Sequence, residues 1–307
     1  MKACYILGIS AFYHDSASAL LKNGEIVAAA QEERFTRVKH DLSFPINSIK
    51  FLLNQENISL ADIDHIVFYE KPFLKFNRIL KTVFAFAPRG FENFRNILRG
   101  WLFGKLFTSK KIIKELKKID KNFHTKKINY VEHHLSHASS AFYPSPFEES
   151  AILPIDGVGE WSTTSLSVGK GNKINILEEI KFPHSIGLLY SVFTSYLGFK
   201  VNSGEYKVMG LAPYGRPVFK NLILEKLVDL KNDGSFRLNL DFFDYTYSNK
   251  MFNHKLEKLF NTKKRTEEGT IEQIHKDIAA SIQSAVEIIV LKIAKYCREK
   301  TQKIDYV

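Results

Sequence analysis

Short apolar runs alternate with turn residues at the start of the chain. Runs of strand length occupy residues 4–10, 16–21 and 25–30, and Asn23-Gly24 separates the second run from the third. An Asn-Gly pair between two apolar runs is a strong signal for a tight hairpin turn. We therefore predict a three-stranded meander, with a polar turn at residues 10–15 between its first two strands.

The rest of the chain mixes helical and strand-like hydrophobic patterns. Apolar residues recur at helical spacing in three segments, and shorter apolar runs bounded by polar residues indicate further strands. We expect helices at residues 45–54, 185–198 and 271–298, and strands at residues 64–69, 128–131 and 303–307. Strands interspersed with helices in this way are typical of an α/β fold.

Residues 151–179 repeat the pattern of residues 5–33. The two segments align without a gap, share apolar and acidic positions, and each has a glycine-containing turn before its third strand. The pattern predicts two related α/β halves around a cleft, in which the first hairpin turn of each half, at residues 10–15 and 156–160, faces the ligand. A chance match between two strand–turn–strand runs stays open as the alternative.

We accordingly divide the chain into a first half at residues 1–145 and a second half at residues 146–307. The strand expected at residues 303–307 has no partner after it, so we expect the second half to be truncated, that is, incomplete at its C-terminus. The length of 307 residues and the hydrophobic fraction of 45% suffice for one large or two ordinary domains with buried cores.

The net charge of +11 is concentrated in one segment. Residues 71–127 contain 16 lysines and arginines against three acidic residues, interleaved with phenylalanine and tryptophan. We interpret this segment as a helical insertion in the first half, whose aromatic side chains pack inward and whose lysines are solvated. Contact with an anionic membrane or partner surface is the alternative, and nucleic-acid binding is the least favoured interpretation.

Hydropathy and cysteine usage limit the cellular setting. No apolar run approaches about 18 residues, the length needed to span a bilayer. Cys4 and Cys297 offer neither a disulfide framework nor a CxxC motif. We therefore expect a cytoplasmic protein.

Two histidines in the segment His133-His-Leu-Ser-His137 are one helical turn apart. This spacing lets two imidazoles bind one metal ion, and a position near the start of a helix disfavours the imidazolium form. Asp156, in the Asp-Gly-Val-Gly turn of the second half, is the candidate third ligand. Iron or manganese suits two imidazoles and a carboxylate with open positions, and zinc stays open. The alternative is that the histidines only cap and pack.

Two further segments carry residues suited to catalysis or ligand binding. His14, in the first polar turn, could act as a general base on a substrate hydroxyl, or it is an ordinary surface histidine. In the glycine-containing segment 204–215, Lys207 and Gly210 could meet a phosphate or acyl group, or they belong to an ordinary Gly/Pro loop. The chain has neither GxxxxGK(S/T) nor a GxGxxG that opens a helix, which argues against P-loop enzymes and dehydrogenases.

Five motifs follow one another along the chain. They occupy residues 8–20, 31–37, 133–138, 156–160 and 207–215. In this order they resemble the O-carbamoyltransferases of the nodulation and antibiotic-tailoring type. The resemblance implies a duplicated actin/Hsp70-like (ribonuclease H-like) fold related to the threonylcarbamoyl-tRNA transferases, in agreement with the repeat described above.

The resemblance also implies an activity. In this family a separate C-terminal domain makes carbamoyl-adenylate from carbamoyl phosphate and ATP, and the N-terminal domain transfers the carbamoyl group to a hydroxyl of a sugar or natural product. The resemblance implies that the histidine pair and Asp156 bind iron. It further implies that His14 lies beside the acceptor hydroxyl and that Lys207 and Gly210 line the adenylate pocket.

The chain departs from the family in length. The family's fourth metal ligand, a later glycine-rich loop and the adenylate-forming domain would lie beyond Val307. Catalysis by this chain alone is therefore open, and a partner chain could supply the missing part. The rival functions are a sugar kinase or threonylcarbamoyl-tRNA transferase of the same fold, and a non-catalytic fragment that binds a nucleotide or a membrane.

Overall fold

The computed structural model describes residues 2–90, 95, 107–124, 127–267, 269–302 and 305–306. They form a mixed α/β protein with two compact units. The first unit contains the described residues of 1–76 and 97–136, and the second those of 77–96 and 137–307. The division into related halves at residues 145–146 stays a prediction.

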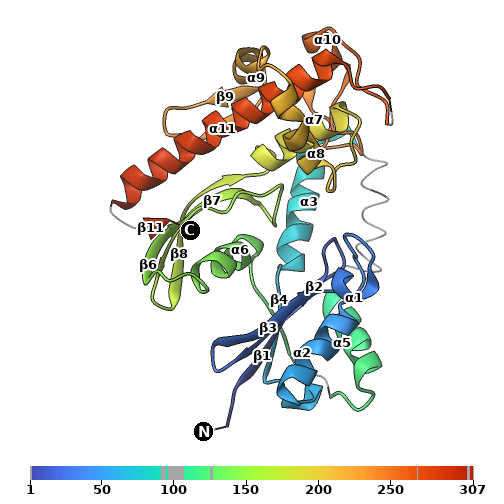
Figure 1. Ribbon diagram of the computed structural model, residues 1–307, viewed down its shortest axis with the longest axis vertical. Helices are drawn as coiled ribbons and strands as arrows, with labels where there is room; N and C mark the ends of the chain where they lie inside the picture. The colour runs from blue at the N-terminus through green and yellow to red at the C-terminus, as the bar shows by residue number, and fades with distance from the viewer. Residues whose placement is uncertain are drawn as a thin grey trace. The chain divides into compact units, whose positions relative to one another are not determined.

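The first unit is built on a five-stranded sheet in the order β3-β2-β1-β4-β5. The strands are β1 (Tyr5–Ser10), β2 (Ala17–Lys22), β3 (Glu25–Gln31), β4 (His65–Phe68) and β5 (Ile128–Tyr130). The first three strands pair antiparallel, whereas β4 pairs parallel with β1, and β5 parallel with β4. The predicted meander and the two later strands of this sheet are therefore confirmed (Figure 1).

Two helices complete the core of the first unit. Helix α2 (Ile46–Glu56) packs against β2, β3 and α5 (Thr108–Ile119), and the unit also contains α1 (Glu33–Thr36) and the short helix η1 (Leu60–Asp62). Fully buried side chains of the sheet and of both helices meet in one cluster: Leu7, Leu20, Ile49, Leu52, Ile66, Ile112 and Leu116. The amphipathic patterns of these helices are therefore explained by one shared core.

Helix α2 is capped from outside its own sequence. Its N-cap residue is Pro45, whose side chain cannot accept the first N–H groups of the helix. The buried carboxylate of Glu32 accepts the backbone N–H groups of Asn47 and Ser48, at 3.1 and 2.9 Å. Glu32, which follows β3 directly, therefore fixes the start of α2 against the sheet.

The second unit contains a four-stranded sheet in the order β11-β6-β7-β8. Its strands are β6 (Glu149–Ile152), β7 (Ser162–Lys170), β8 (Lys173–Lys181) and β11 (Asp305–Tyr306). Strands β6, β7 and β8 form an antiparallel meander, and β11 pairs parallel with β6. The first sheet has the same local order, with β4 parallel to the first strand of its meander. Two related halves would each have this strand order. The duplication itself stays a prediction.

Helices cover the second unit around a large apolar core. They are α7 (Ile186–Tyr196), α8 (Glu205–Leu211), α9 (Lys220–Lys226), α10 (His254–Phe260) and α11 (Gln273–Thr301), with the short helices η3 (Ala212–Tyr214) and η4 (Leu240–Phe242) and the hairpin of β9 (Val228–Leu230) and β10 (Phe236–Leu238). Helix α11 packs against α7, α8 and α9 (Figure 1). The fully buried side chains at this contact include Val192, Phe193, Tyr196, Ile278, Ile282 and Ile289. The predicted helices at residues 185–198 and 271–298 are thus confirmed.

The described parts of the basic segment 71–127 are largely helical. They comprise α3 (Pro72–Phe86), which runs from the first unit into the second, and α5. The expectation that the aromatic residues pack inward is wrong for Phe73 and Phe84, whose side chains are 71% and 75% exposed. The two lie about three helical turns apart on one face of α3, whereas the buried Arg78 lies on another. Residues 91–94, 96–106 and 125–126 of the segment lie outside the described residues.

Among the residues that the structure covers, no helix is both long enough and apolar enough to cross a bilayer. Helix α11 has 29 residues, but charged side chains recur along its length.

The pH dependence of folding should contain a contribution from His184. Burial, and secondarily the nearby Arg237 guanidinium, lower the pKa of His184, whose Nδ1 accepts the N–H of Leu238 at 3.1 Å. Between the lowered pKa and the ordinary value of 6.5 the unfolded chain binds more protons, so this contribution to stability is lost as the pH falls. We expect His184→Asn, whose side-chain oxygen can still accept the N–H, to flatten the pH dependence of the urea midpoint around pH 6.5.

The matched control is His254→Asn, at an exposed position at the start of α10. It should keep the pH dependence of the unmodified chain. Parallel pH profiles for the unmodified chain and His184→Asn would contradict the prediction.

Candidate functional site

Helix α6 (His133–Phe142) carries the two histidines predicted to bind a metal ion. His133 is its first residue, and His137 follows one turn later on the same face. The division between the two units falls inside this helix, after Ser136. Because the helix is continuous, its own geometry sets the distance between the two imidazoles.

Asp156 lies close to this histidine pair. Its Oδ2 is 3.9 Å from Nε2 of His137, and one ligand atom each of His133, His137 and Asp156 lies within 4.8 Å of the other two. The side chains of His137 and Asp156 are 49% and 29% exposed, so a cation could reach them. Two imidazoles and a carboxylate form a donor set that suits iron, manganese or zinc. The structure thus brings the three predicted ligands together in an arrangement that fits a metal ion, while metal binding itself stays a prediction.

The turn that carries Asp156 is attached to the first turn of α7. The Asp156 N–H donates to Thr163 O at 2.8 Å, and Oδ1 of Asp156 accepts the Gly157 N–H at 2.6 Å. Ser185, the N-cap of α7, is fully buried, and its hydroxyl donates to the carbonyl groups of Gly157 and Asp156 at 2.7 and 3.1 Å. The same hydroxyl accepts the Leu188 N–H at 3.0 Å, so one side chain both caps the helix and holds the turn.

Gly187 allows α7 and the turn to approach this closely. A Cβ atom at this position would lie 2.7 Å from both the Asp156 carbonyl oxygen and the Gly157 nitrogen. Real side chains do not pack at that distance from backbone atoms. Only glycine therefore fits here without displacing the turn or the helix.

Arg78 contacts the same turn from α3. It is 9% exposed, its Nη1 donates to the Gly159 carbonyl at 2.8 Å, and its guanidinium lies 5.1 Å from the ring centroid of Phe182. A buried guanidinium requires such hydrogen bonds and a stacking surface, because desolvation is costly. The basic segment thus supplies a structural residue to the turn beside Asp156.

His14, the predicted general base, lies in the turn between β1 and β2. Its side chain is 48% exposed, and Nδ1 lies 2.8 Å from Oδ2 of Asp15. Burial tends to raise the pKa of Asp15, but the hydrogen bonds from His40 and His14 outweigh it and lower the pKa below the ordinary value. His14 belongs to the first unit, whereas His137 and Asp156 belong to the second. Its catalytic role stays a prediction.

Lys207 and Gly210 lie on helix α8 rather than in an irregular loop. Lys207 is exposed, with Nζ 5.8 Å from the ring centroid of Phe199. A Cβ at Gly210 would meet no atom within 4 Å, so no close approach of the described chain requires glycine there. At Gly204, by contrast, a Cβ would lie 2.7 Å from the Lys200 carbonyl oxygen. Nucleotide contact by Lys207 and Gly210 stays a prediction.

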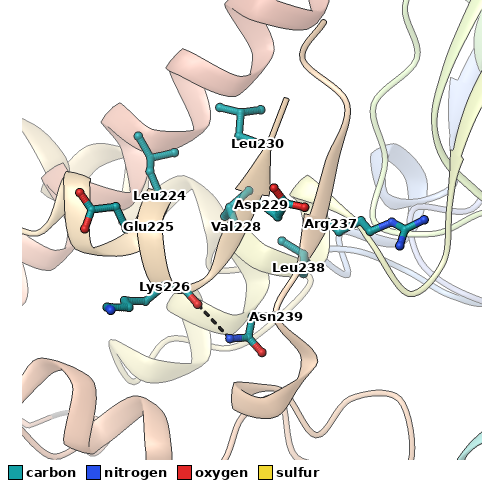
Figure 2. Close-up of a pocket in the computed structure, with 9 residues that line it drawn as sticks. All are labelled: Leu224, Glu225, Lys226, Val228, Asp229, Leu230, Arg237, Leu238 and Asn239. Carbon is teal, nitrogen blue, oxygen red and sulfur yellow. Dashed lines mark hydrogen bonds between the residues drawn. The ribbon is translucent and has the colours of Figure 1, made fainter. Parts of the chain in front are cut away.

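A hollow of about 590 Å³ lies elsewhere in the second unit, beside α9, β9 and β10. It is lined by Leu224, Glu225, Lys226, Val228, Asp229, Leu230, Arg237, Leu238 and Asn239, and contains none of the predicted site residues. Figure 2 shows the Lys226 and Arg237 side chains pointing in opposite directions, while Asn239 donates to the Lys226 carbonyl at 3.1 Å. Its charged groups do not converge on one point, so it is a poor candidate for an active site.

Three residues that hold the Asp156 turn, Ser185, Gly187 and Arg78, are not among the site residues predicted from the sequence. Ser185 precedes an apolar helical pattern, which is a recognisable N-cap signal. Gly187 interrupts that pattern, and a glycine inside a helix often has a packing reason. Arg78 has no local signal, because its partners lie about eighty and a hundred positions away along the chain.

Replacing Gly187 by alanine should weaken metal binding without unfolding α7. Alanine favours the helix by about 0.5–1 kcal/mol, but its Cβ would push the Asp156 turn away from the histidine pair. We expect the affinity for Mn²⁺ or Co²⁺ to fall by about 10- to 100-fold, the usual effect of changing a residue that supports a ligand. Competition with a chromogenic chelator measures the affinity.

Gly210→Ala is the matched control on α8, where the added Cβ meets open space. It should leave the metal affinity unchanged. Equal metal affinities for Gly187→Ala and Gly210→Ala would show that the close approach at Gly187 does not position Asp156.

Comparison with known proteins gives the chain a family. The profile described as "Carbamoyltransferase N-terminus" matches residues 5–305. An uncharacterized protein of Synechocystis sp. is 53% identical over 298 residues, which are 96% of this chain and 48% of that protein. The nodulation protein NolNO of Sinorhizobium fredii is 34% identical over 291 residues, which are 94% of this chain and 39% of that protein. The chain therefore spans half or less of the length of these relatives.

Similarity to solved structures is weaker. Component A of the (R)-2-hydroxyglutaryl-CoA dehydratase of Acidaminococcus fermentans is 15% identical, with a TM-score of 0.40 over 99% of this chain and 92% of that chain. The actin/Hsp70-like arrangement stays a prediction, because a TM-score this low does not establish a shared fold. The family assignment rests on the sequence match over residues 5–305. On that basis, the chain belongs to the carbamoyltransferase N-terminal domain family.

Proposed function

We propose that this chain is the carbamoyl-transferring part of an O-carbamoyltransferase, with a hydroxyl of a sugar or natural product as acceptor. The carbamoyl donor in this proposal is carbamoyl-adenylate, made from carbamoyl phosphate and ATP by a further part of the enzyme or by a partner chain. The observation that carries the proposal is the convergence of His133, His137 and Asp156 in a chain of the carbamoyltransferase family.

The proposed metal ligands are His133, His137 and Asp156, and iron is the proposed metal. Bound there, a divalent cation would supply Lewis-acid polarisation of the carbamoyl carbonyl or neutralise the adenylate phosphate. The chain's own contribution is to hold the three donors on one helix and one anchored turn.

His14 is the proposed general base. It would accept the proton of the acceptor hydroxyl as the hydroxyl oxygen bonds to the carbamoyl carbon. The bond from that carbon to the phosphate oxygen then breaks, and AMP leaves with the electron pair. The exposed Lys207 ammonium is the proposed contact for the phosphate, and the exposed Gly210 is the proposed neighbour of the nucleotide.

The metal site is tested by removing both histidines. Chain purified without oxygen should contain stoichiometric metal by mass spectrometry, and His133→Ala combined with His137→Ala should abolish it, because a lone carboxylate binds weakly. The control is His65→Ala combined with His254→Ala, two exposed histidines outside the cluster. Retention of metal by the first double variant would show that the ligand assignment is wrong.

The role of His14 is tested by separating the two reactions, with the chain combined with the proposed part that makes carbamoyl-adenylate. His14→Ala should lower carbamoyl transfer by about 10²- to 10⁴-fold, the usual contribution of a general base, and leave carbamoyl-adenylate formation intact. Labelled carbamoyl phosphate and ATP allow both products to be followed by chromatography. Undiminished transfer would remove His14 from the mechanism, and His65→Ala serves as the control.

A further inference from the structure

Two imidazoles share one carboxylate in the first unit. His14 Nδ1 lies 2.8 Å from Oδ2 of Asp15, and His40 Nδ1 lies 2.9 Å from Oδ1 of the same side chain. An ionised carboxylate only accepts hydrogen bonds, so each Nδ1 must carry the proton of its contact. The arrangement therefore selects the Nδ1–H form of both rings.

The pairing leaves the two Nε2 atoms in different surroundings. The side chain of His14 is 48% exposed, so a substrate can reach this ring. The Nε2 of His40 is buried and has no hydrogen-bond partner among the described residues. A proton on that atom would bury an unsatisfied donor, which is unfavourable. His40 therefore fits the role of a fixed hydrogen-bond donor to Asp15.

Backbone conformation and main-chain hydrogen bonds keep His14, Asp15 and His40 close to one another. Asp15 has a left-handed conformation, with φ of 48°, which aspartate tolerates better than most residues. Its turn is joined to the segment after α1, because Phe12 N–H donates to Leu42 O at 3.2 Å and Ser16 N–H donates to Asp41 O at 2.8 Å. These bonds place His40 beside Asp15 through main-chain contacts on either side of the turn.

The segment that carries His40 is fixed in turn by carboxylates. The His40 N–H donates to Oε2 of Glu33 at 3.0 Å, and Asp41 accepts the hydroxyl of Thr36 and the N–H of Ser43 at 2.7 and 2.8 Å. These bonds fix the backbone of His40, so its side chain stays within hydrogen-bond distance of Asp15.

We propose that Asp15 is a positioning residue that holds His14 in the Nδ1–H tautomer, with the Nε2 lone pair directed to the acceptor hydroxyl, and that His40 holds Asp15. The catalytic part of this inference rests on the proposed function of His14. In the transfer step the hydroxyl proton moves to Nε2 of His14, while the Nδ1 proton stays in its hydrogen bond to Asp15. The carboxylate then stabilises the imidazolium that forms, as in other Asp–His pairs.

The tautomers are measured directly on the 307-residue chain with isotope-labelled histidine. Two-bond proton–nitrogen spectra distinguish protonated from unprotonated ring nitrogens, and we expect Nδ1–H for both His14 and His40. The two rings contact different oxygens of Asp15, and Asp15→Asn replaces one of these oxygens by an amide donor, so one ring then faces a donor in place of an acceptor. At least one ring should therefore lose the Nδ1–H form in this variant.

Asp64→Asn is the matched control, because Asp64 is another loop carboxylate of the first unit and accepts the Tyr5 N–H at 2.8 Å. It should leave both tautomers unchanged. If both rings keep Nδ1–H in a folded Asp15→Asn chain, the inference is overturned. A second result would also overturn it. If Zn²⁺ added to the chain with His133→Ala and His137→Ala displaces the proton from Nδ1 of His40 and binds there, Asp15, Glu33 and His40 form a cation site instead.

Two substitutions of His40 distinguish a hydrogen-bonding role, in which His40 positions Asp15, from a role in packing alone. Asparagine places its amide nitrogen as many bonds from Cα as Nδ1 of histidine, so His40→Asn can still donate to Asp15. In the same transfer assay as for His14→Ala, we expect His40→Ala to lower kcat by about tenfold or more with little change in KM, and His40→Asn to restore most of it. Equal kcat values for the two variants would overturn the role of His40.

The two proposals fail in different ways. Changed tautomers in Asp15→Asn together with full transfer by His14→Ala would overturn the catalytic role of His14 while keeping the pairing with Asp15. Unchanged tautomers together with lost transfer in His14→Ala would keep the proposed function and overturn the positioning by Asp15.

Discussion

The site depends on the direct packing of α7 against the turn that carries Asp156. A short polar turn has little stability of its own, since its backbone groups need partners and its conformational entropy opposes order. Ser185 supplies a hydroxyl to the turn carbonyls, Gly187 removes the side chain that would separate the two backbones, and Arg78 donates to Gly159 from α3. The Asp156 carboxylate keeps its place near His137 because these contacts fix the backbone on which it stands.

The positions of the candidate metal ligands depend both on this tertiary packing and on local helix geometry. The spacing of His133 and His137 follows from helical geometry alone, whereas the approach of Asp156 requires the β6–β7 turn and α7 to pack together. In the first unit, the turn around His14 is also held by hydrogen bonds from a segment outside the turn. There Asp15 is held by His40 and by main-chain bonds to the segment after α1, and it in turn orients an exposed imidazole.

Both candidate catalytic turns occupy the same place in their sheets. His14 lies between the first two strands of the β1–β2–β3 meander, and Asp156 between the first two strands of the β6–β7–β8 meander. Each meander also has a parallel strand beside its first strand, β4 or β11. The end of a strand paired on both sides is a rigid support, so a turn at that point can present a side chain with little loss of order.

The sequence by itself determined the features that depend on neighbouring residues. Alternation of apolar positions and the Asn23-Gly24 turn predicted the first meander, helical periodicity predicted α7 and α11, and the HxxxH spacing predicted a shared face for His133 and His137. Tertiary structure decided the rest. The buried cap that Glu32 gives to α2, the exposure of Phe73 and Phe84, and the contacts of Gly187 and Arg78 with the Asp156 turn join residues far apart in the chain. The local sequence pattern does not predict such contacts. They depend on which helices and strands pack against one another, whereas the pattern reports only the spacing of residues within one helix or strand.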